Sequence, residues 1–249
     1  MTQRYFSRQP VVGPSVELQG DEARHLSRVM RAQPGDETIV FDGSGAEFRC
    51  EITDVQRNSV QLSVLERREI DRESPIALTL AVSLPKGDRQ RWLVEKLTEL
   101  GVTCLQPLKT ERSVAQPSDN ALERLRRAVI EASKQCGRNR LMDVAEAMPW
   151  PEFVSQAEEN NGTLRIVADP SGTAQACDLL PHDTAQQREI ERPREIIGAI
   201  GPEGGFSPEE LDIARSQGWQ IMNLGERILR VETAAVAIAS VVAMQPRHK

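Results

Sequence analysis

Aromatic side chains are scarce in this chain, at 4% of 249 residues, and no apolar run approaches the length of a membrane span. The N-terminus, MTQRYFSRQP, lacks the apolar core of a signal peptide. Charged residues make up 27%, which is ordinary for a soluble protein. We therefore expect a cytoplasmic protein that makes no contact with a membrane.

Cysteine and histidine are also few. The four cysteines lie far apart with no C-x-x-C pair, so neither structural zinc nor a disulfide framework is expected. They are Cys50, Cys104, Cys136 and Cys177. The three histidines, His25, His182 and His248, have no ligand spacing. The sequence predicts reduced thiols and no metal site.

The net charge of -6 argues against a nucleic-acid partner, but the distribution of charge matters more than its sum. Residues 124–140 hold six basic side chains against the single acid Glu131, and residues 1–31 hold five more arginines. A charge run is equally often a solvated helix face. Charge alone leaves RNA binding and simple solvation open.

Residues 37–65 alternate between apolar and polar side chains, with turns at 42–45 and 57–59. This pattern predicts antiparallel, half-buried strands in a small barrel or sandwich. A short helix is expected at 21–30, with Arg24, His25 and Arg28 on its polar face. The charged stretch 66–75 ends in proline and is interpreted as a linker.

From Ile76 the pattern changes to apolar runs that alternate with helical spacing. Such alternation predicts an α/β domain with a parallel, doubly wound sheet. Strands are expected at 76–84, 102–108, 164–168, 195–200 and 219–224. Helices are expected at 88–100, 119–136 and 232–244.

The stretch IGPEGGFSPEEL, residues 200–211, joins a strand to a helix. Ser207 is the expected N-cap, with Pro208 at the first helical position. Gly201, Gly204 and Gly205 permit positive φ and leave the backbone unobstructed. A loop of this kind at the end of a strand is where open α/β sheets bind ligands. An ordinary tight turn is the alternative.

The stretch LGERILRVETAAVAIAS, residues 224–240, leads into a final helix of small apolar residues, which should be buried all round. Arg230 and Glu232 lie at the start of this helix, where burying a charge is costly unless the charge is paired or takes part in function. The two side chains could pair with each other or cap the helix. They could instead serve a reaction.

These two loops, in order with six further motifs, resemble the RsmE family of SPOUT-superfamily RNA methyltransferases. The other motifs are RYF (4–6), HLSRVMR (25–31), FDGSG (41–45), EKLTELGV (95–102), ERS (111–113) and EASKQCGRNR (131–140). The family methylates ring nitrogen 3 of a uridine in 16S ribosomal RNA. The resemblance covers essentially the whole chain.

The resemblance implies a fold and partners that spacing alone does not show. It implies an N-terminal PUA-like β-barrel for RNA binding at 1–70 and a SPOUT methyltransferase domain at 75–249. The second domain would be an α/β domain with a deep trefoil knot. It further implies S-adenosylmethionine as cofactor, 16S rRNA within the small ribosomal subunit as partner, and a homodimer with the active site near its interface.

The resemblance also assigns residues. Arg230 would stabilise the developing uridine anion, and Glu232 would orient it or act as base. The cofactor pocket would comprise Ala168, Asp169, Gly201, Pro202, Glu203, Gly204, Leu224, Gly225, Ile228, Leu229, Arg230 and Thr233. The RNA contacts would comprise Arg4, His25, Arg28, Arg31, Arg138 and Arg140. His25 could equally be a packed side chain.

Two other classes of function share part of this pattern. A nicotinamide-dependent Rossmann enzyme would have the same alternation, but G-x-G-x-x-G does not occur after the first strand. A non-catalytic RNA-binding protein would keep the barrel and the basic clusters. A test of S-adenosylmethionine binding separates this second class from a methyltransferase, because a non-catalytic RNA-binding protein would not bind the methyl donor.

Overall fold

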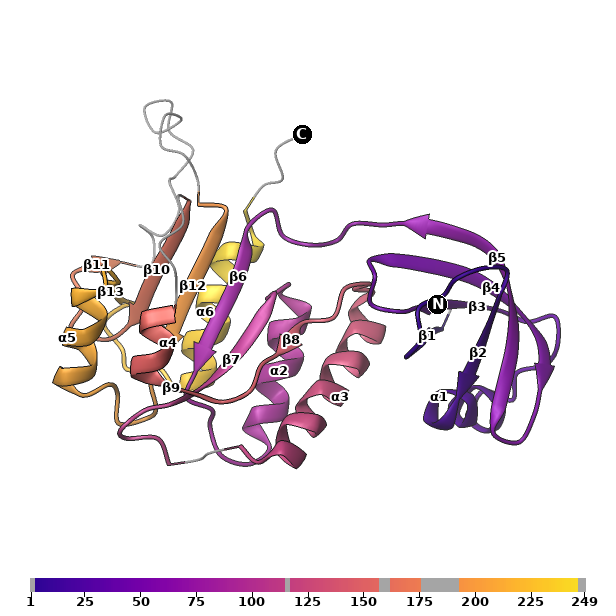
Figure 1. Cartoon of the computed structure of the whole chain (residues 1–249), viewed down its shortest axis with the longest axis horizontal. Helices are drawn as coiled ribbons and strands as arrows, with labels where there is room; N and C mark the ends of the chain where they lie inside the picture. The colour runs from indigo at the N-terminus through magenta and orange to yellow at the C-terminus, as the bar shows by residue number, and fades with distance from the viewer. Residues whose placement is uncertain (1–2, 115–116, 157–161, 176–192, 246–249) are drawn as a thin grey trace, which may run out of the picture. The chain divides into compact units, whose positions relative to one another are not determined.

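The computed structural model describes residues 3–114, 117–156, 162–175 and 193–245. Their contacts divide the chain into two compact units (Figure 1). Unit 1 holds residues 1–73 and 130–141, and unit 2 holds 74–129 and 142–249. The predicted domains, 1–70 and 75–249, differ from this division at 130–141, which pack with unit 1.

Unit 1 is a curled sheet of five strands in the order β1-β3-β4-β5-β2. All neighbours are antiparallel except the parallel pair β1 and β3. The strands are β1 (Arg4–Phe6), β2 (Ser15–Gln19), β3 (Glu37–Phe41), β4 (Ala46–Val55) and β5 (Ser59–Glu69). The antiparallel strands predicted within 37–65 are confirmed.

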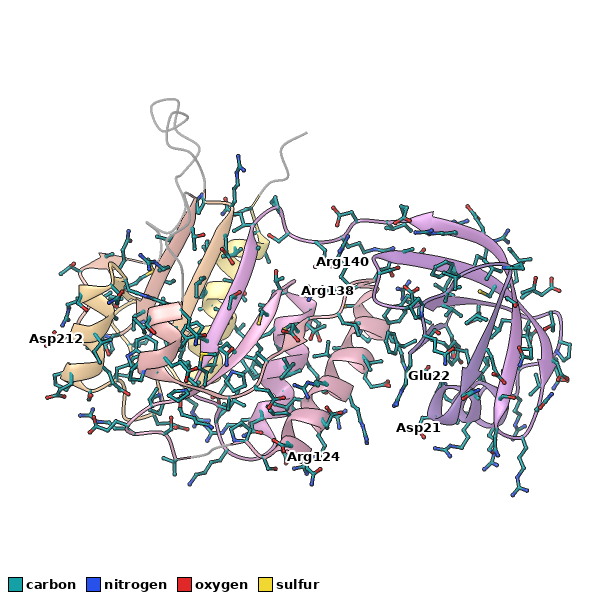
Figure 2. The ribbon with its side chains drawn as sticks, viewed as in Figure 1. Asp21, Glu22, Arg124, Arg138, Arg140 and Asp212 are labelled. Carbon is teal, nitrogen blue, oxygen red and sulfur yellow. The ribbon has the colours of Figure 1, made fainter. Side chains whose placement is uncertain are left out.

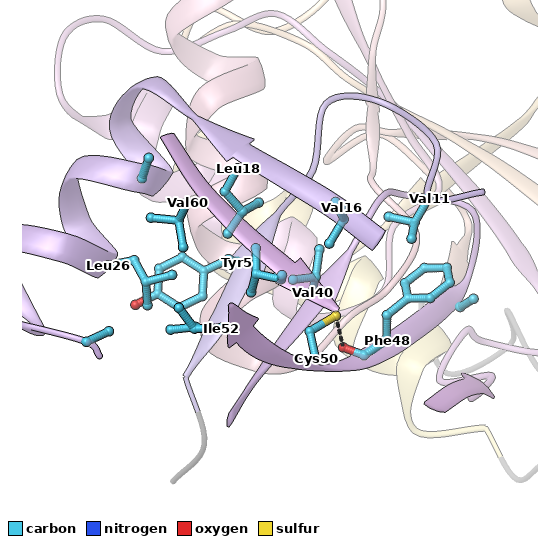
Figure 3. Packing of buried hydrophobic residues seen from close by; sticks show 14 residues of the cluster. Tyr5, Val11, Val16, Leu18, Leu26, Val40, Phe48, Cys50, Ile52 and Val60 are labelled. Atoms are coloured by element: carbon cyan, nitrogen blue, oxygen red, sulfur yellow. Dashed lines mark hydrogen bonds between the residues drawn. The ribbon is translucent and has the colours of Figure 1, made fainter. Parts of the chain in front are cut away.

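The core of unit 1 follows from the alternation of its strands. On β4, Phe48, Cys50 and Ile52 point to one face and are buried, and Val60 and Leu62 of β5 do the same. Figure 3 shows Phe48, Cys50, Ile52 and Val60 in one cluster with Tyr5, Val16 and Leu18. The sheet therefore curls around an apolar interior that is mostly aliphatic and includes the aromatic rings of Tyr5 and Phe48.

The predicted linker at 66–75 is wrong for its first four residues. Residues 66–69 continue β5, because Arg67 and Arg68 stand opposite Phe48 and Glu47 in the ladder with β4. Cross-strand pairing here outweighs the local signal of a charged stretch. The guanidinium carbon of Arg67 also lies 6.0 Å from the centre of the Phe48 ring.

The helix predicted at 21–30 is confirmed, with an unexpected geometry. It begins as α1 (Gly20–Arg24) and continues as a π-helical segment, η1 (His25–Val29). Ala23 of α1 and Leu26 of η1 point into the core and are buried. Arg31 follows with a φ of 55°, which is uncommon for a non-glycine residue. The basic motif of this region thus lies on a wide helical turn.

Residues 130–141 join unit 1 through polar contacts. Nζ of Lys134 donates to Oε1 of Glu22 over 2.8 Å. The guanidinium of Arg4 donates to the side-chain oxygen of Asn139, and that of Arg72 to the carbonyl of Gly137. Figure 2 labels Glu22 on α1, with Arg138 and Arg140 on the segment that follows α3. These contacts explain why the segment belongs to unit 1.

Unit 2 is a parallel sheet in the order β11-β13-β10-β12-β6-β7-β8, with β9 beside β7. The five predicted strands are confirmed as β6 (Ala77–Val82), β7 (Cys104–Lys109), β10 (Thr163–Ala168), β12 (Glu195–Ile200) and β13 (Gln220–Asn223). The two-residue strands β8 (Asp143–Val144), β9 (Met148–Pro149) and β11 (Ala174–Gln175) were not predicted.

Helices cover both faces of this sheet, as predicted for a doubly wound domain. On one face α4 (Trp150–Gln156) and α5 (Pro208–Ser216) enclose a core that contains Trp150, Phe206 and Trp219. On the other face α6 (Val231–Ala243) packs against β6, β12 and α2 (Arg89–Glu99). Figure 1 shows α4 in front of the sheet and α6 behind it. The helix α3 (Asp119–Cys136) contributes residues 119–129 to unit 2 and residues 130–136 to unit 1.

The final helix is less buried than predicted. Val231, Ala235, Ile238 and Val242 of α6 are buried, but residues 236, 237, 240 and 241 are only half-buried and Met244 is 79% exposed. One apolar stripe of α6 is thus only partly covered by the residues that the structure describes. No helix among the described residues is long and apolar enough to cross a membrane. The trefoil knot stays a prediction.

Candidate active site at the carboxyl edge of the parallel sheet

The predicted cofactor loops begin at neighbouring positions of one sheet edge. Ala168 of β10 pairs with Ile200 of β12 and with Met222 of β13, and Ile200 pairs in turn with Val82 of β6. The loops after these four strands therefore start side by side. Backbone hydrogen bonds tie their first residues, since the Ser83 N–H donates to the carbonyl of Ile200 over 3.0 Å. This is the edge at which open α/β sheets bind ligands.

The glycine-rich loop, residues 201–207, ends in a capping box. Ser207 accepts a hydrogen bond from the Glu210 N–H, and the Glu210 carboxylate accepts from the Ser207 N–H over 2.9 Å. The predicted N-cap and the proline at the helix start are confirmed. Both ends of the loop are thereby fixed, one by β12 and one by α5.

The glycines of this loop have different structural roles. Gly205 has a φ of 69°, as predicted. Gly201 instead makes room for Phe206, whose ring and backbone nitrogen would lie 3.0–3.2 Å from an added Cβ. The sequence permits positive φ at all three glycines, but Gly201 and Gly204 do not adopt it. At Gly204 an added Cβ would meet only the side chain of Arg112, at 3.4 Å and beyond.

A second loop, after β7, holds the glycine-rich loop in place. The Glu111 N–H donates to Oε1 of Glu210 over 2.8 Å, and Nη1 of Arg112 donates to the carbonyl of Gly204 over 2.8 Å. The carboxylate of Glu210 thus joins two loops and a helix start. Neither Arg112 nor Glu210 was predicted as a site residue, although the ERS motif contains Arg112. The partner of Arg112, Gly204, is 92 residues away, so no local pattern identifies Arg112. Glu210 had a local signal, because Ser207 and Glu210 form the S-x-x-E pattern of a capping box.

The loop after β13, residues 224–230, presents apolar side chains to solvent. Ile228 is 88% exposed, and Leu224 and Leu229 are half-buried. Gly225 has a φ of 113°, and its N–H donates to the side-chain oxygen of Asn223 over 2.7 Å. Apolar side chains of this kind suit an aromatic base better than a phosphate.

The loop after β10 begins with Asp169, whose N–H donates to the carbonyl of Met222 over 3.0 Å. Its carboxylate accepts from the backbone and the hydroxyl of Ser171. An added Cβ on Gly205 would lie 3.9 Å from Oδ2 of Asp169. The predicted pocket residue Asp169 therefore approaches the glycine-rich loop at Gly205, which was not itself predicted as a pocket residue.

Arg230 and Glu232 lie at the start of α6, but they do not pair with each other. Glu232 is 7% exposed, and its Oε1 lies 3.5 Å from Nη1 of Arg89. Arg230 is exposed, is the N-cap residue of α6, and makes no capping bond through its side chain. Within the part of the chain that the structure describes, its guanidinium has no ion-pair partner. Arg89 was missed by the sequence analysis.

The predicted RNA-contact residues all lie in unit 1 and fall into two groups. His25, Arg28, Arg31 and Arg140 are exposed. Arg4 and Arg138 are largely buried in ion pairs: Arg4 with Glu47 at 2.7 Å and Arg138 with Glu73 at 2.6 Å. His25 also contacts the Tyr5 ring, with the two ring centres 5.9 Å apart.

The pKa values of Tyr5 and Glu47 in unit 1 are shifted in opposite directions. Burial raises the pKa of Tyr5 to about 12, with a smaller contribution from the charge of Glu22. For Glu47, burial alone would raise the pKa, but the hydrogen bond and charge of Arg4, with the charge of Arg72, outweigh it and lower the pKa. Glu47 is thus kept ionised by two arginines.

Among the described residues, no group of three or more histidine, cysteine or acidic side chains could hold a metal ion. Of the residues considered in the sequence, His182, His248 and Cys177 lie outside the described ranges.

Family models identify the class of protein. A model described as RNA methyltransferase domain matches residues 72–243, and one described as RNA methyltransferase PUA domain matches residues 18–65. The first match alone spans more than half of the chain. The fold and the loops at the sheet edge are therefore those of an RNA methyltransferase with an N-terminal PUA domain.

Relatives narrow the class. The chain is 37% identical over 238 residues to ribosomal RNA small subunit methyltransferase E of Synechocystis sp., covering 94% of this chain and 75% of the relative. It is 29% identical to the protein of that name from Bacillus subtilis, covering 98% and 96%. The chain belongs to the ribosomal RNA small subunit methyltransferase E family. This excludes the nicotinamide-dependent alternative.

Solved structures of relatives share the whole architecture. A ribosomal RNA small subunit methyltransferase E from Neisseria gonorrhoeae, bound to S-adenosyl methionine, is 28% identical with a TM-score of 0.84 and covers 97% of this chain and 96% of its own. A protein from Legionella pneumophila, described as a methyltransferase with bound SAM, is 29% identical with a TM-score of 0.85 and covers 97% of both chains.

Proposed function

We propose that this protein transfers the methyl group of S-adenosylmethionine to ring nitrogen 3 of one uridine in 16S rRNA. One observation carries the proposal: the loops after β6, β10, β12 and β13 start side by side at one sheet edge. The two solved relatives described above, each of which matches 97% of this chain, contain this donor. The protein would act in the cytoplasm, on RNA of the small ribosomal subunit.

The residues at this edge fit the donor. Backbone groups of the glycine-rich loop and the exposed apolar side chain of Ile228 are suited to the adenine ring. When bound, the donor supplies a methyl group already activated on a sulfonium. The pocket would comprise Ala168, Asp169, Gly201, Pro202, Glu203, Gly204, Leu224, Gly225, Ile228, Leu229, Arg230 and Thr233.

The uridine needs more help than the donor. Ring nitrogen 3 carries a proton and is a poor nucleophile until that proton leaves. The exposed guanidinium of Arg230 is available to stabilise the resulting anion. The buried carboxylate of Glu232 stands two residues further on and would accept the proton or orient the base.

The RNA would be held by unit 1. His25, Arg28 and Arg31 lie exposed on or just after the π-helical segment, and Arg140 is exposed after α3. Arginine at such positions contacts phosphates and RNA shape. Arg4 and Arg138 would act indirectly, because Glu47 and Glu73 already occupy their guanidinium groups.

A homodimer would cover the apolar stripe of α6. Val236, Ala237 and Val241 are half-buried and Met244 is exposed, whereas the opposite side of the helix is buried in the core. Obligate interfaces resemble a domain core cut in half, which describes this stripe. A second copy of the chain is therefore the partner we propose for it.

The deciding experiment maps modified nucleotides. Small subunits from cells that lack the gene are incubated with purified protein and S-adenosylmethionine, and the 16S rRNA is digested and analysed by mass spectrometry. We expect one new 3-methyluridine, absent without the donor. A methyl group on a ribose oxygen or on another base would refute the assigned atom, and no transfer would refute the proposed substrate.

A further inference from the structure

Arg89, at the N-terminus of α2, contacts two carboxylates that come from different parts of the candidate site. Its Nη2 lies 3.2 Å from Oε1 of Glu203 in the glycine-rich loop. Its Nη1 lies 3.5 Å from Oε1 of Glu232 at the start of α6. One guanidinium therefore joins the start of α2 to the loop after β12 and to the final helix.

Glu232 is the unusual member of this group. It is 7% exposed, and its Oε2 is fully buried with no hydrogen-bond partner among the described residues. Leaving a buried carboxylate oxygen without a donor is costly. The first turn of α6 offsets part of that cost, because a helix N-terminus favours a negative charge. An N–H or O–H donor on a bound substrate would remove the remaining cost by donating a hydrogen bond to Oε2.

We propose that Arg89 is a positioning residue, which holds Glu232 through Oε1 so that Oε2 stays free to accept the N–H of the target uracil. The inference rests on the proposed function. In the reaction, the N3–H proton passes to Oε2, and the N3 electron pair takes the methyl group. The electrons of the broken carbon–sulfur bond stay on sulfur. Arg89 itself touches no reacting atom.

The geometry of the contact requires arginine rather than lysine. The two carboxylates approach different nitrogens of the same guanidinium, and its planar fork fixes both at once. An ammonium group has one nitrogen and would hold one carboxylate well and the other poorly. With lysine, the positions of Glu203 and Glu232 would no longer be fixed relative to each other.

The experiment compares Arg89→Met and Arg89→Lys with Arg91→Met as the matched control. Arg91 lies on the same helix, pairs with Glu95 at 2.8 Å and is largely exposed. Single-turnover methyl transfer to undermethylated small subunits is measured with both substrates saturating, beside calorimetric binding of S-adenosylhomocysteine. Glu232→Gln is combined with Arg89→Met to measure their coupling.

We expect Arg89→Met to lower the single-turnover rate about tenfold or more, with S-adenosylhomocysteine affinity changed less than about threefold. Arg89→Lys should recover part of the rate, and Arg91→Met should stay within about twofold of wild type. Adding Glu232→Gln to Arg89→Met should cost little more, because both changes disable the same carboxylate.

Three results would overturn the inference. They are an Arg89→Met rate equal to that of the Arg91→Met control, rate losses of Arg89→Met and Glu232→Gln that multiply, and a defect confined to S-adenosylhomocysteine affinity. A wild-type protein that binds S-adenosylhomocysteine but methylates no small subunit would refute the proposed function instead, so the two failures are distinguishable.

Discussion

Nη1 of Arg112 donates a hydrogen bond of 2.8 Å to the carbonyl oxygen of Gly204, although the two residues are 92 positions apart in the chain. The contact fixes the middle of the glycine-rich loop, whose ends are already fixed by β12 and α5. A charged donor on a backbone carbonyl is among the stronger hydrogen bonds of a protein.

Arg112→Ala should therefore weaken binding of the donor. A hydrogen bond to a charged group contributes about 1.5 kcal/mol, so we expect roughly a tenfold loss of S-adenosylhomocysteine affinity by calorimetry. Arg215→Ala is the control, since Arg215 is exposed on α5 and pairs with Asp212. Equal affinities for the two variants would show that the loop needs no fixing from β7.

Alanine substitutions at the three glycines of the loop should differ in how much they reduce stability and S-adenosylhomocysteine affinity. Gly201→Ala should be the most damaging, because the new Cβ meets Phe206 at 3.0 Å. Gly205→Ala should destabilise the protein by about 1–2 kcal/mol through its positive φ. Gly204→Ala should be tolerated, since its new Cβ would meet the Arg112 side chain at ordinary contact distances of 3.4 Å and beyond. Thermal unfolding and S-adenosylhomocysteine affinity check the order, and a damaging Gly204→Ala would contradict it.

Arg138 and Arg140 should separate stability from RNA binding. Arg138→Met removes the partner of Glu73 in a largely buried pair and should cost about 3 kcal/mol of unfolding free energy. Arg140→Met removes an exposed guanidinium and should leave stability unchanged while lowering RNA affinity and flattening its salt dependence. Denaturant titrations and filter binding at several salt concentrations measure both. The reverse pattern would exclude Arg140 from the RNA interface.

Arg230→Ala should lower the rate of methyl transfer about a hundredfold while binding of either substrate changes little. The rate profile should also move to higher pH, because the uracil proton leaves less readily without the nearby positive charge. Single-turnover rates across pH, with both substrates saturating, test this. A small rate loss with an unchanged profile would mean that Arg230 only shapes the loop.

Glu47 should make unit 1 sensitive to acid. Its pKa is lower in the folded protein than in the unfolded chain, so its contribution to stability is present above about pH 4.3 and is lost as the pH falls through the folded value. Glu47→Gln should destabilise the protein at pH 7, and the gap to wild type should narrow on acidification. Glu66→Gln, on the surface, is the control and should have little effect at any pH.

Long apolar runs made the parallel sheet predictable, and the order of motifs indicated the family. The strands β8, β9 and β11 have two residues each and carry no periodic signal. The helix α4 had a usable signal that was missed: Pro151 follows its first residue, and Trp150, Phe153 and Val154 are spaced for one buried face.

The candidate site was predictable in its loops but not in their cross-links. Gly201 and Gly205 stand in a recognisable strand-to-helix turn. Arg89 meets Glu203 and Glu232 from more than a hundred residues away, and only the folded sheet brings them together. Arg138 is a second example. Its basic motif indicated an RNA contact, but the folded structure pairs its guanidinium with Glu73 in a largely buried ion pair.

Unit 1 is discontinuous in the chain, and this affects its synthesis. Residues 1–73 emerge from the ribosome first, yet Lys134, Arg138 and Asn139, which hold Glu22, Glu73 and Arg4, are translated much later. At ordinary elongation rates the wait is on the order of several seconds. During that time the acidic side chains of Glu22 and Glu73 have no basic partner from 130–141, so the N-terminal unit is completed only when more than half of the protein has been made.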